Sequence, residues 1–148
     1  TPLRLQRERA MIPADRLFCD TSFFYACLAR GDRYYRRAGE LLEQCRTQRV
    51  LMFSTWEVVS ETLTLFTYRL HPQAAIEFLD TMKPVLSLVP VTGALLAEAE
   101  QVFRRQVRSR RLSFCDAISF VVATTVLDNI PCLSFDKDFR ALGLTVIG

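Results

Sequence analysis

Acidic residues follow or interrupt apolar segments at four places in the chain. Asp20 directly follows the apolar residues 17–19, and Asp136 directly follows a second apolar run. Asp116 lies inside an otherwise apolar segment, and Glu61 lies among apolar neighbours of a predicted helix. Carboxylates that converge repel one another unless a cation joins them, and oxygen-only ligands suit Mg²⁺ or Mn²⁺. The acids therefore predict a carboxylate metal site.

A metal of this kind promotes one main class of reaction when phosphate is nearby. Mg²⁺ takes only one or two carboxylates directly, so the remaining acids can orient its waters. Water bound to a metal loses a proton more easily, and the metal neutralises charge that builds on a phosphoryl group. Arginine, whose planar fork suits phosphate, is clustered at Arg30, Arg33, Arg36 and Arg37 and again at Arg104, Arg105, Arg108, Arg110 and Arg111. The combination favours phosphodiester hydrolysis, although a cationic helix end explains the second cluster equally.

Three of the acids also have a purely structural interpretation. Asp20 can cap the following helix, although we expect Thr21 or Ser22 to be the cap. Asp116 falls in the first turn of a predicted helix, where the helix dipole favours an acid. Asp136 can cap a short helix and bind a metal together, and Asp138 lies two residues beyond it.

The helix predicted at residues 56–70 contributes the remaining acid. Its start matches a capping box with Ser54 as the cap and Glu57 as its partner, so we interpret Glu57 as structural. Glu61 lies away from the main apolar face but still among apolar residues. The pattern predicts a helix covered on two sides, with Glu61 facing something polar.

The absence of other motifs narrows the chemistry. His71 is the only histidine and stands in a Leu-His-Pro helix break, where a structural role is favoured. A two-histidine ribonuclease mechanism is therefore excluded, and a Ser-His-Asp or Cys-His site would need this one residue. Neither of the glycine-rich phosphate-binding motifs occurs, which disfavours a nucleotide cofactor.

Composition is that of one soluble domain. The chain has 148 residues, of which 50% are hydrophobic and 24% charged, and its longest apolar run falls short of a membrane span. The five scattered cysteines include no C-x-x-C pair, which predicts reduced, buried thiols. We expect a cytoplasmic protein. Residues 1–15 are predicted to form an Arg-rich arm, flexible or foreign to the natural chain, whose natural start is then Met11.

Hydrophobic periodicity predicts alternating strands and helices from residue 16 onward. The strands are expected at residues 17–19, 50–53, 85–91, 132–135 and 144–147. The helices are expected at residues 23–29, 32–46, 56–70, 73–82, 92–103, 113–127 and 136–141. This order predicts an α/β fold at residues 16–148, a three-layer α/β/α sandwich with a mostly parallel five-stranded sheet. The acids at strand ends then share one edge of the sheet.

Four stretches of the sequence carry a resemblance to a known family. The chain resembles the PIN-domain ribonucleases, and within them the VapC-type toxins of toxin–antitoxin pairs. The matching stretches are LFCDTS at residues 17–22, SETL at 60–63, LSFCDA at 112–117 and SFDKDF at 134–139. Each is short, but their order and separations together are fairly specific and span roughly residues 16–148.

The resemblance implies a metal-dependent endoribonuclease that hydrolyses RNA phosphodiester bonds with a metal-activated water. It implies that Asp20, Glu61 and Asp116 are the core acids and that the fourth is Asp136 or Asp138. Asp20, Asp116 and Asp136 would bind Mg²⁺ or Mn²⁺, with support from the hydroxyls of Thr21 and Ser22. A homodimer and a small antitoxin partner are also implied.

Two other functions remain open on the sequence. A PIN-like domain that binds RNA or assembles without catalysis would have the same fold. A phosphatase of the haloacid-dehalogenase type would need a second Asp where this chain has Ser22, which weighs against it.

Overall fold

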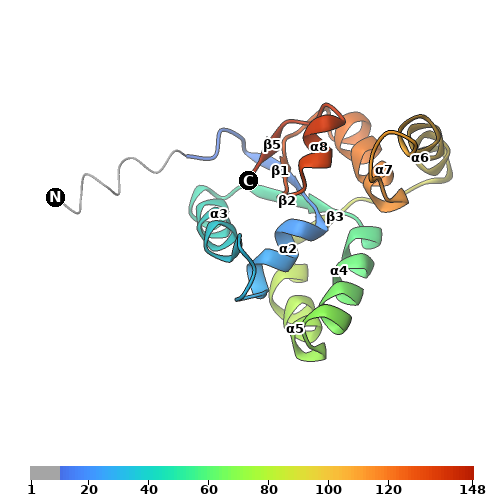
Figure 1. Cartoon of the computed structure of the whole chain (residues 1–148). Coiled ribbons are helices and arrows are strands. Elements are labelled where there is room, and N and C mark those ends of the chain that lie inside the picture. The colour runs from blue at the N-terminus through green and yellow to red at the C-terminus, as the bar shows by residue number, and fades with distance from the viewer. Residues whose placement is uncertain (1–10) are drawn as a thin grey trace.

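A computed structural model describes residues 11–148 of the protein (Figure 1). Its centre is a five-stranded sheet in which each neighbouring pair of strands is parallel. The strand order is β3-β2-β1-β4-β5. The strands are β1 (Arg16–Cys19), β2 (Leu51–Ser54), β3 (Leu86–Leu88), β4 (Cys132–Leu133) and β5 (Val146–Ile147). The predicted parallel sheet is confirmed.

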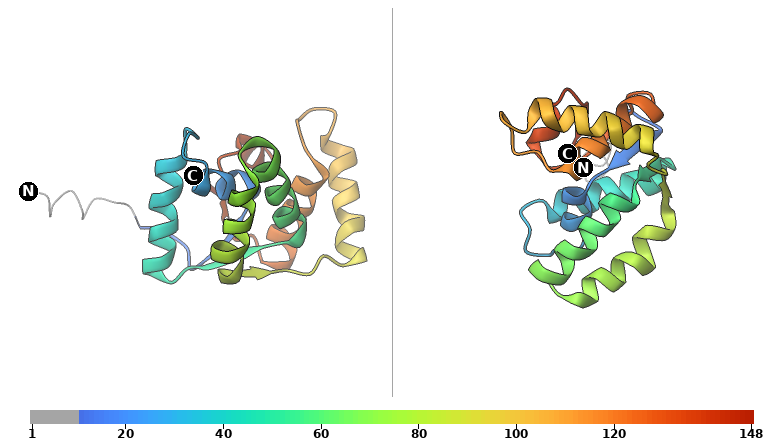
Figure 2. Two further views of the ribbon diagram at one scale, coloured as in Figure 1. Left: turned by 90° about the horizontal axis from the view of Figure 1, so that it is seen from below. Right: turned by 90° about the vertical axis from the view of Figure 1, so that its right-hand side faces the viewer.

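The direction in which the chain builds the sheet reverses after β3, and the helices change face with it. Crossovers between parallel strands are right-handed, so opposite directions of travel place their helices on opposite faces. One layer holds α2 (Thr21–Leu28), α3 (Tyr35–Gln48), α4 (Trp56–Arg69) and α5 (Pro72–Glu77). The other holds α6 (Gly93–Gln106), α7 (Phe114–Val121) and α8 (Lys137–Ala141), as the right-hand view of Figure 2 shows for α6 against the α4–α5 pair. The predicted three-layer sandwich is confirmed.

The core lies between the sheet and both helical layers. Strand β1 is the middle strand of the sheet and is fully buried from Leu17 to Cys19, as expected where helices cover both faces of a parallel sheet. The largest fully buried side chains are Phe18, Phe23, Phe24, Phe66, Phe78 and Phe139. Asp20 therefore follows directly on a strand that is packed inside the core.

The caps of two helices differ from the predicted ones. Asp20 itself caps α2, because its carboxylate accepts from the Phe23 amide at 3.2 Å. Thr55 caps α4 by accepting from the Val58 amide at 3.2 Å, so the predicted capping box of Ser54 and Glu57 is wrong. The reason is register: β2 continues through Ser54, whose hydroxyl instead donates to the Cys19 carbonyl at 2.9 Å.

Several element boundaries also differ. The helix predicted at residues 73–82 ends its α-helical part at Glu77 and continues as a π-helical turn, η1 (Phe78–Met82). A 3₁₀ turn, η2 (Lys83–Val85), then delays β3, which is shorter than predicted. Helix α7 likewise passes into a π-helical turn, η3 (Val122–Val126). The strand predicted at residues 132–135 stops at Leu133, which frees the next two residues for the site.

Other expectations of the sequence fall on single residues. His71 caps α5 through Nδ1, which accepts from the Ala74 amide at 3.2 Å, so its structural role is confirmed. The five cysteines are free thiols, as predicted, but only Cys19, Cys45 and Cys132 are buried, whereas Cys27 and Cys115 are half-buried. Of the predicted arm, residues 1–10 lie outside the described residues, whereas Ile12 is buried and exchanges two hydrogen bonds of 3.0 Å with Gln48. Within residues 11–148 no helix is both long and apolar enough to cross a membrane.

Candidate active site

The candidate site lies where the chain reverses its direction across the sheet. Strands β1 and β4 are neighbours there, with Phe18 opposite Cys132 and Cys19 opposite Leu133. The next residues along the two strands are Asp20 and Ser134. Ligands of open α/β sheets bind in the crevice outside the carboxyl ends of the strands at this switch point. The topology therefore assigns the most favourable crevice to the edge that carries Asp20.

Asp20 is held by three donors from two segments, the start of α2 and the loop after β4. Its Oδ1 accepts from the Ser22 hydroxyl at 2.8 Å and from the Phe23 amide at 3.2 Å. Its Oδ2 accepts from the Ser134 hydroxyl at 2.8 Å. Ser22 and Ser134 are 3.2 Å apart and accept from the amides of the loop after β4. These hydrogen bonds fix the carboxylate in one orientation. Asp20 is also buried, with 5% of the residue exposed.

Burial dominates the electrostatics of this carboxylate. The pKa of Asp20 is raised from 3.8 to about 7, chiefly by desolvation and to a lesser extent by the charge of Asp116, while the three hydrogen bonds from Ser134, Ser22 and Phe23 act to lower it. The ionised form is therefore costly unless a cation approaches. Neither ion pair found within residues 11–148, Arg37–Glu40 or Arg46–Glu43, involves one of the candidate acids.

Asp116 lies at the start of α7 and forms a capping box. Its Oδ2 accepts from the Ser113 amide at 3.1 Å, while the Ser113 hydroxyl accepts from the Asp116 amide at 3.0 Å. The pKa of Asp116 is raised to about 6, chiefly by burial and also by the charges of Asp136 and Glu61, while the hydrogen bonds with Ser113 act to lower it. The cap engages only one of the two carboxylate oxygens, Oδ2.

Asp136 and Asp138 differ in their relation to the site. Asp136 caps α8, with its Oδ1 accepting from the Asp138 amide at 2.9 Å. Burial raises the pKa of Asp136, and the charges of Asp138 and Glu61 add to the rise. The charge of Asp136 in turn raises the pKa of Asp116. Of the two alternatives for the fourth acid, Asp136 is therefore the one that couples to Asp116.

Glu61 faces α7 from the middle of α4, the two helices being in contact. It lies close to the Cys115 thiol, whose pKa is raised by burial first and then by Glu61. Glu57, one turn earlier on α4, also raises the pKa of Cys115. With no capping box to satisfy it, Glu57 keeps a buried Oε2 that has no partner among residues 11–148. Glu57 is thus a further acid near the site, which the sequence interpretation had set aside.

The acids lie near one another without forming a closed shell of metal ligands. In the described part of the chain, no group of three His, Cys, Asp or Glu side chains is arranged to hold a metal ion. Hydrogen bonds from the protein engage one oxygen or both of Asp20, Asp116 and Asp136. Such a set still fits Mg²⁺ or Mn²⁺, because Mg²⁺ takes one or two carboxylates and retains several waters.

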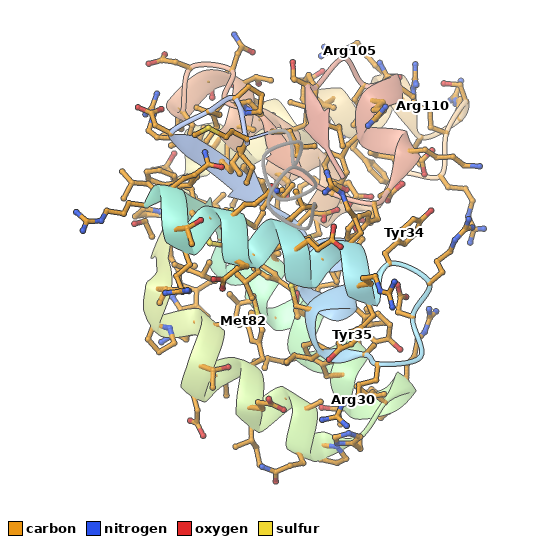
Figure 3. The ribbon with its side chains drawn as sticks, turned by 90° about the vertical axis from the view of Figure 1, so that its left-hand side faces the viewer. Arg30, Tyr34, Tyr35, Met82, Arg105 and Arg110 are labelled. Carbon is orange, nitrogen blue, oxygen red and sulfur yellow. The ribbon has the colours of Figure 1, made fainter. Side chains whose placement is uncertain are left out.

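The remaining predicted site residues lie beside this edge or away from it. Thr21 is buried, and its hydroxyl accepts from Thr62 at 3.3 Å, which ties α2 to the α4 turn that carries Glu61. Arg104 and Arg105 lie in the last turn of α6. Arg108, Arg110 and Arg111 follow in the connection that leads to Asp116, and Figure 3 shows Arg105 and Arg110 with the α6–α8 layer, opposite Arg30. These arginines precede Asp116 closely in the sequence. Within residues 11–148, however, none of them forms an ion pair with a candidate acid.

Ser134 is the site residue that sequence reasoning missed. It was assigned to the end of a strand, and its link to Asp20 becomes visible only when β1 and β4 are known to be neighbours. The side chain is 2% exposed, donates to Asp20 and accepts from the Asp136 amide at 3.0 Å. One hydroxyl therefore joins two of the candidate acids.

Replacing Ser134 is expected to destabilise the protein. Ser134→Ala removes a hydrogen bond to a carboxylate and leaves the Asp136 amide unpaired, which costs about 2–3 kcal/mol. Chemical denaturation measures the loss, and Ser87→Ala, at an exposed position of β3, is the matched control. Equal stability of the two variants would contradict the role assigned to Ser134.

Comparisons with known proteins agree with this geometry. The family model "PIN domain" matches residues 17–144. A crystal structure of Mycobacterium tuberculosis VapC20, described as a toxin that cleaves the sarcin-ricin loop, is 28% identical and has a TM-score of 0.76. The match covers 87% of this chain and 96% of that one, whereas a search of curated proteins found no significant match. The resemblance stated from the sequence is confirmed: the chain belongs to the PIN domain family.

Proposed function

We propose that the protein is a metal-dependent endoribonuclease and the toxin of a toxin–antitoxin pair. The observation that carries this proposal is the set of acids at the switch point. The charge of Asp116 raises the pKa of Asp20, and the charge of Asp136 raises the pKa of Asp116. Glu61 raises the pKa of both Asp116 and Asp136. The likeness to VapC20, which covers nearly the whole of that toxin, supports the same conclusion.

Each acid has a distinct task in this proposal. Asp20, Asp116 and Asp136 would hold Mg²⁺ or Mn²⁺, which lowers the pKa of water and neutralises charge on the phosphoryl group. Ser22 and Ser134 keep the Asp20 oxygens in place by donating to both of them. Glu61 lies on α4, across from Asp116 on α7, and is suited to orient water and to accept a proton. Asp138 is proposed only to support α8.

Removal of divalent metal is the direct test. We expect EDTA to abolish RNA cleavage and Mg²⁺ or Mn²⁺ to restore it, because carboxylates at this density bind substrate phosphate only when a cation screens them. A labelled RNA carrying the sarcin-ricin loop is the first substrate to try, given the activity of VapC20, and product fragments on a denaturing gel are the readout. Undiminished cleavage in EDTA would contradict metal dependence.

The arginines between α6 and α7 are proposed to contact RNA phosphates. Arg108 and Arg111 are exposed. Changing both to Gln is expected to weaken RNA binding and to flatten its salt dependence by about 0.7 in the slope of log K against log salt for each lost phosphate contact. Filter binding at several salt concentrations measures the slope. Arg46→Gln, on α3, is the control; an unchanged slope in the double variant would remove these residues from the interface.

Protein partners are the third part of the proposal. We include a homodimer and a small antitoxin, as the resemblance to VapC toxins implies. Support comes from an apolar groove of about 580 Å³ bordered by Leu42, Leu51 and Val85. Leu51 and Val85 are 56% and 62% exposed, and contiguous apolar surface of this kind commonly meets a protein.

The alternative function is RNA binding without catalysis. The acids and their raised pKa values favour the nuclease, because a binding surface for an anion gains nothing from buried carboxylates. Tight RNA binding that never leads to metal-dependent cleavage would favour the alternative.

A further inference from the structure

We propose that a hollow between the start of α3 and α8 binds one nucleotide of the RNA beside the cleaved bond. The hollow has a volume of about 230 Å³, and its walls include Tyr34, Phe135, Lys137 and Arg140. It is smaller than the ~300 Å³ at which pockets for drug-sized ligands begin, which suits a single nucleotide unit. The inference rests on the proposed function, because it names a subsite for that substrate.

The hollow borders the acids directly. Asp136 and Ser134 belong to its walls. The Ser134 hydroxyl donates to Asp20 at 2.8 Å, so a single side chain separates the hollow from the most buried acid. An RNA whose phosphate reaches the acids therefore places an adjoining nucleotide at the mouth of the hollow.

Two aromatic rings form one wall of the hollow and offer contacts that suit a nucleotide base. Tyr34 and Phe135 stack with centroids 4.5 Å apart and an angle of 3° between their planes. The Arg33 guanidinium lies over the Tyr34 ring, 4.9 Å from its centroid. Because Phe135 occupies one face and Arg33 the other, Tyr34 meets the hollow with its edge and hydroxyl. Single-stranded RNA is read by aromatic contacts and by hydrogen bonds to base edges, which this wall offers together.

Both rings are held before any ligand arrives. The Tyr34 amide donates to the Asp32 carboxylate at 2.8 Å, and the Phe135 amide donates to the Ser22 hydroxyl at 2.9 Å. In Figure 3 Tyr34 projects toward the C-terminal elements of the chain, whereas the adjacent Tyr35 lies lower, toward α5. A preformed wall lowers the entropy lost on binding.

Two cations on α8 complete the hollow. Lys137 and Arg140 are three residues apart and therefore share a helix face. Arg140 also donates from Nη2 to the Val146 carbonyl at 3.4 Å, which keeps its guanidinium beside β5. These cations suit the phosphate of the nucleotide, while the Asp136 carboxylate in the same wall repels a phosphate that lies deeper. Charge thus orients the nucleotide with its base toward Tyr34 and Phe135.

Binding to an RNA that is not cut provides the test. The parent protein is Asp116→Asn in Mg²⁺, a variant in which cleavage is expected to be suppressed, and the probe is a short fluorescein-labelled single-stranded RNA of randomised sequence, followed by fluorescence anisotropy. We expect Tyr34→Ala to bind the probe about tenfold more weakly, because it removes the ring edge and the hydroxyl that meet the base and takes the stacking partner from Phe135. Tyr35→Ala, the neighbouring tyrosine outside the hollow, should bind as the parent does.

Two further variants keep the test decisive if Tyr34→Ala misfolds. Tyr34→Phe retains the stack and should change only the preference among four homopolymeric probes, because it removes the hydroxyl. The Lys137→Ala, Arg140→Ala double variant should weaken all four equally. Loss of binding in the double variant alone marks an anion subsite and overturns the nucleotide assignment, as does unchanged affinity in every variant, which leaves the hollow to a protein partner. Since no cleavage is involved, failure of the wild type to cut RNA would instead overturn the proposed nuclease.

Discussion

Asp20→Asn and Asp116→Asn are each expected to lower RNA cleavage by at least about 100-fold, because loss of the groups that merely support metal ligands already costs about 10–100-fold in metal affinity or activity. The reason is charge: each substitution keeps the shape of the side chain but removes a negative oxygen from the set that would hold the metal. Cleavage of the labelled sarcin-ricin loop RNA under single-turnover conditions measures the effect.

Both substitutions should leave the fold intact. Asn at position 20 can still accept from Ser22 and Phe23 through its carbonyl oxygen, and its amide can donate to Ser134, which accepts in exchange. Asp80→Asn, at an exposed position of η1, is the matched control and should cleave at the wild-type rate. Activity that survives in Asp20→Asn or Asp116→Asn with a native circular dichroism spectrum would contradict the proposed site.

The metal-free protein is expected to lose stability as pH rises from about 4 to about 7. The folded-state pKa of Asp20 is about 7, above its ordinary 3.8, so the folded state binds more protons than the unfolded state between these values. Stability therefore falls with rising pH in that window, by at most about 4 kcal/mol for this group. Asp116, with a pKa of about 6, acts in the same direction. Urea denaturation in EDTA at several pH values measures the slope.

Two comparisons identify Asp20 as the source of that slope. Asp20→Asn should be more stable than the wild type at pH 8 without metal, because the buried charge is gone, and its stability should vary less from pH 4 to 7. Mg²⁺ or Mn²⁺ should stabilise the wild type at pH 8 more than the variant, since a ligand that binds only the folded state adds to its stability. A wild type whose metal-free stability rises steadily from pH 4 to 8 would contradict the raised pKa of Asp20.

The sequence predicted the fold where periodicity and burial agree. Apolar runs marked β1, β2 and β4, and their alternation with helices predicted a parallel sheet between two helical layers. It failed where two local signals compete. Ser54 and Glu57 match a capping box, but strand pairing keeps Ser54 in β2 and moves the cap to Thr55. Asp20 was expected to leave the cap to a hydroxyl, yet its carboxylate caps α2 at the carboxyl edge of the sheet.

The sequence by itself determined which residue types reach the edge of the sheet, because an acid after a buried strand has no other place to emerge. That was sufficient to select Asp20 and Asp136, whereas Asp116 was selected as an acid inside an apolar segment at the start of a predicted helix, and together the three acids predicted metal-dependent chemistry. Only the tertiary structure decided which strands are neighbours. The pairing of β1 with β4 brings Ser134 to Asp20, and the packing of the loop before α3 against the loop after β4 sets Tyr34 on Phe135. These contacts join residues more than a hundred positions apart, so no local pattern specifies them, and they determine how the acids are held and what lies beside them.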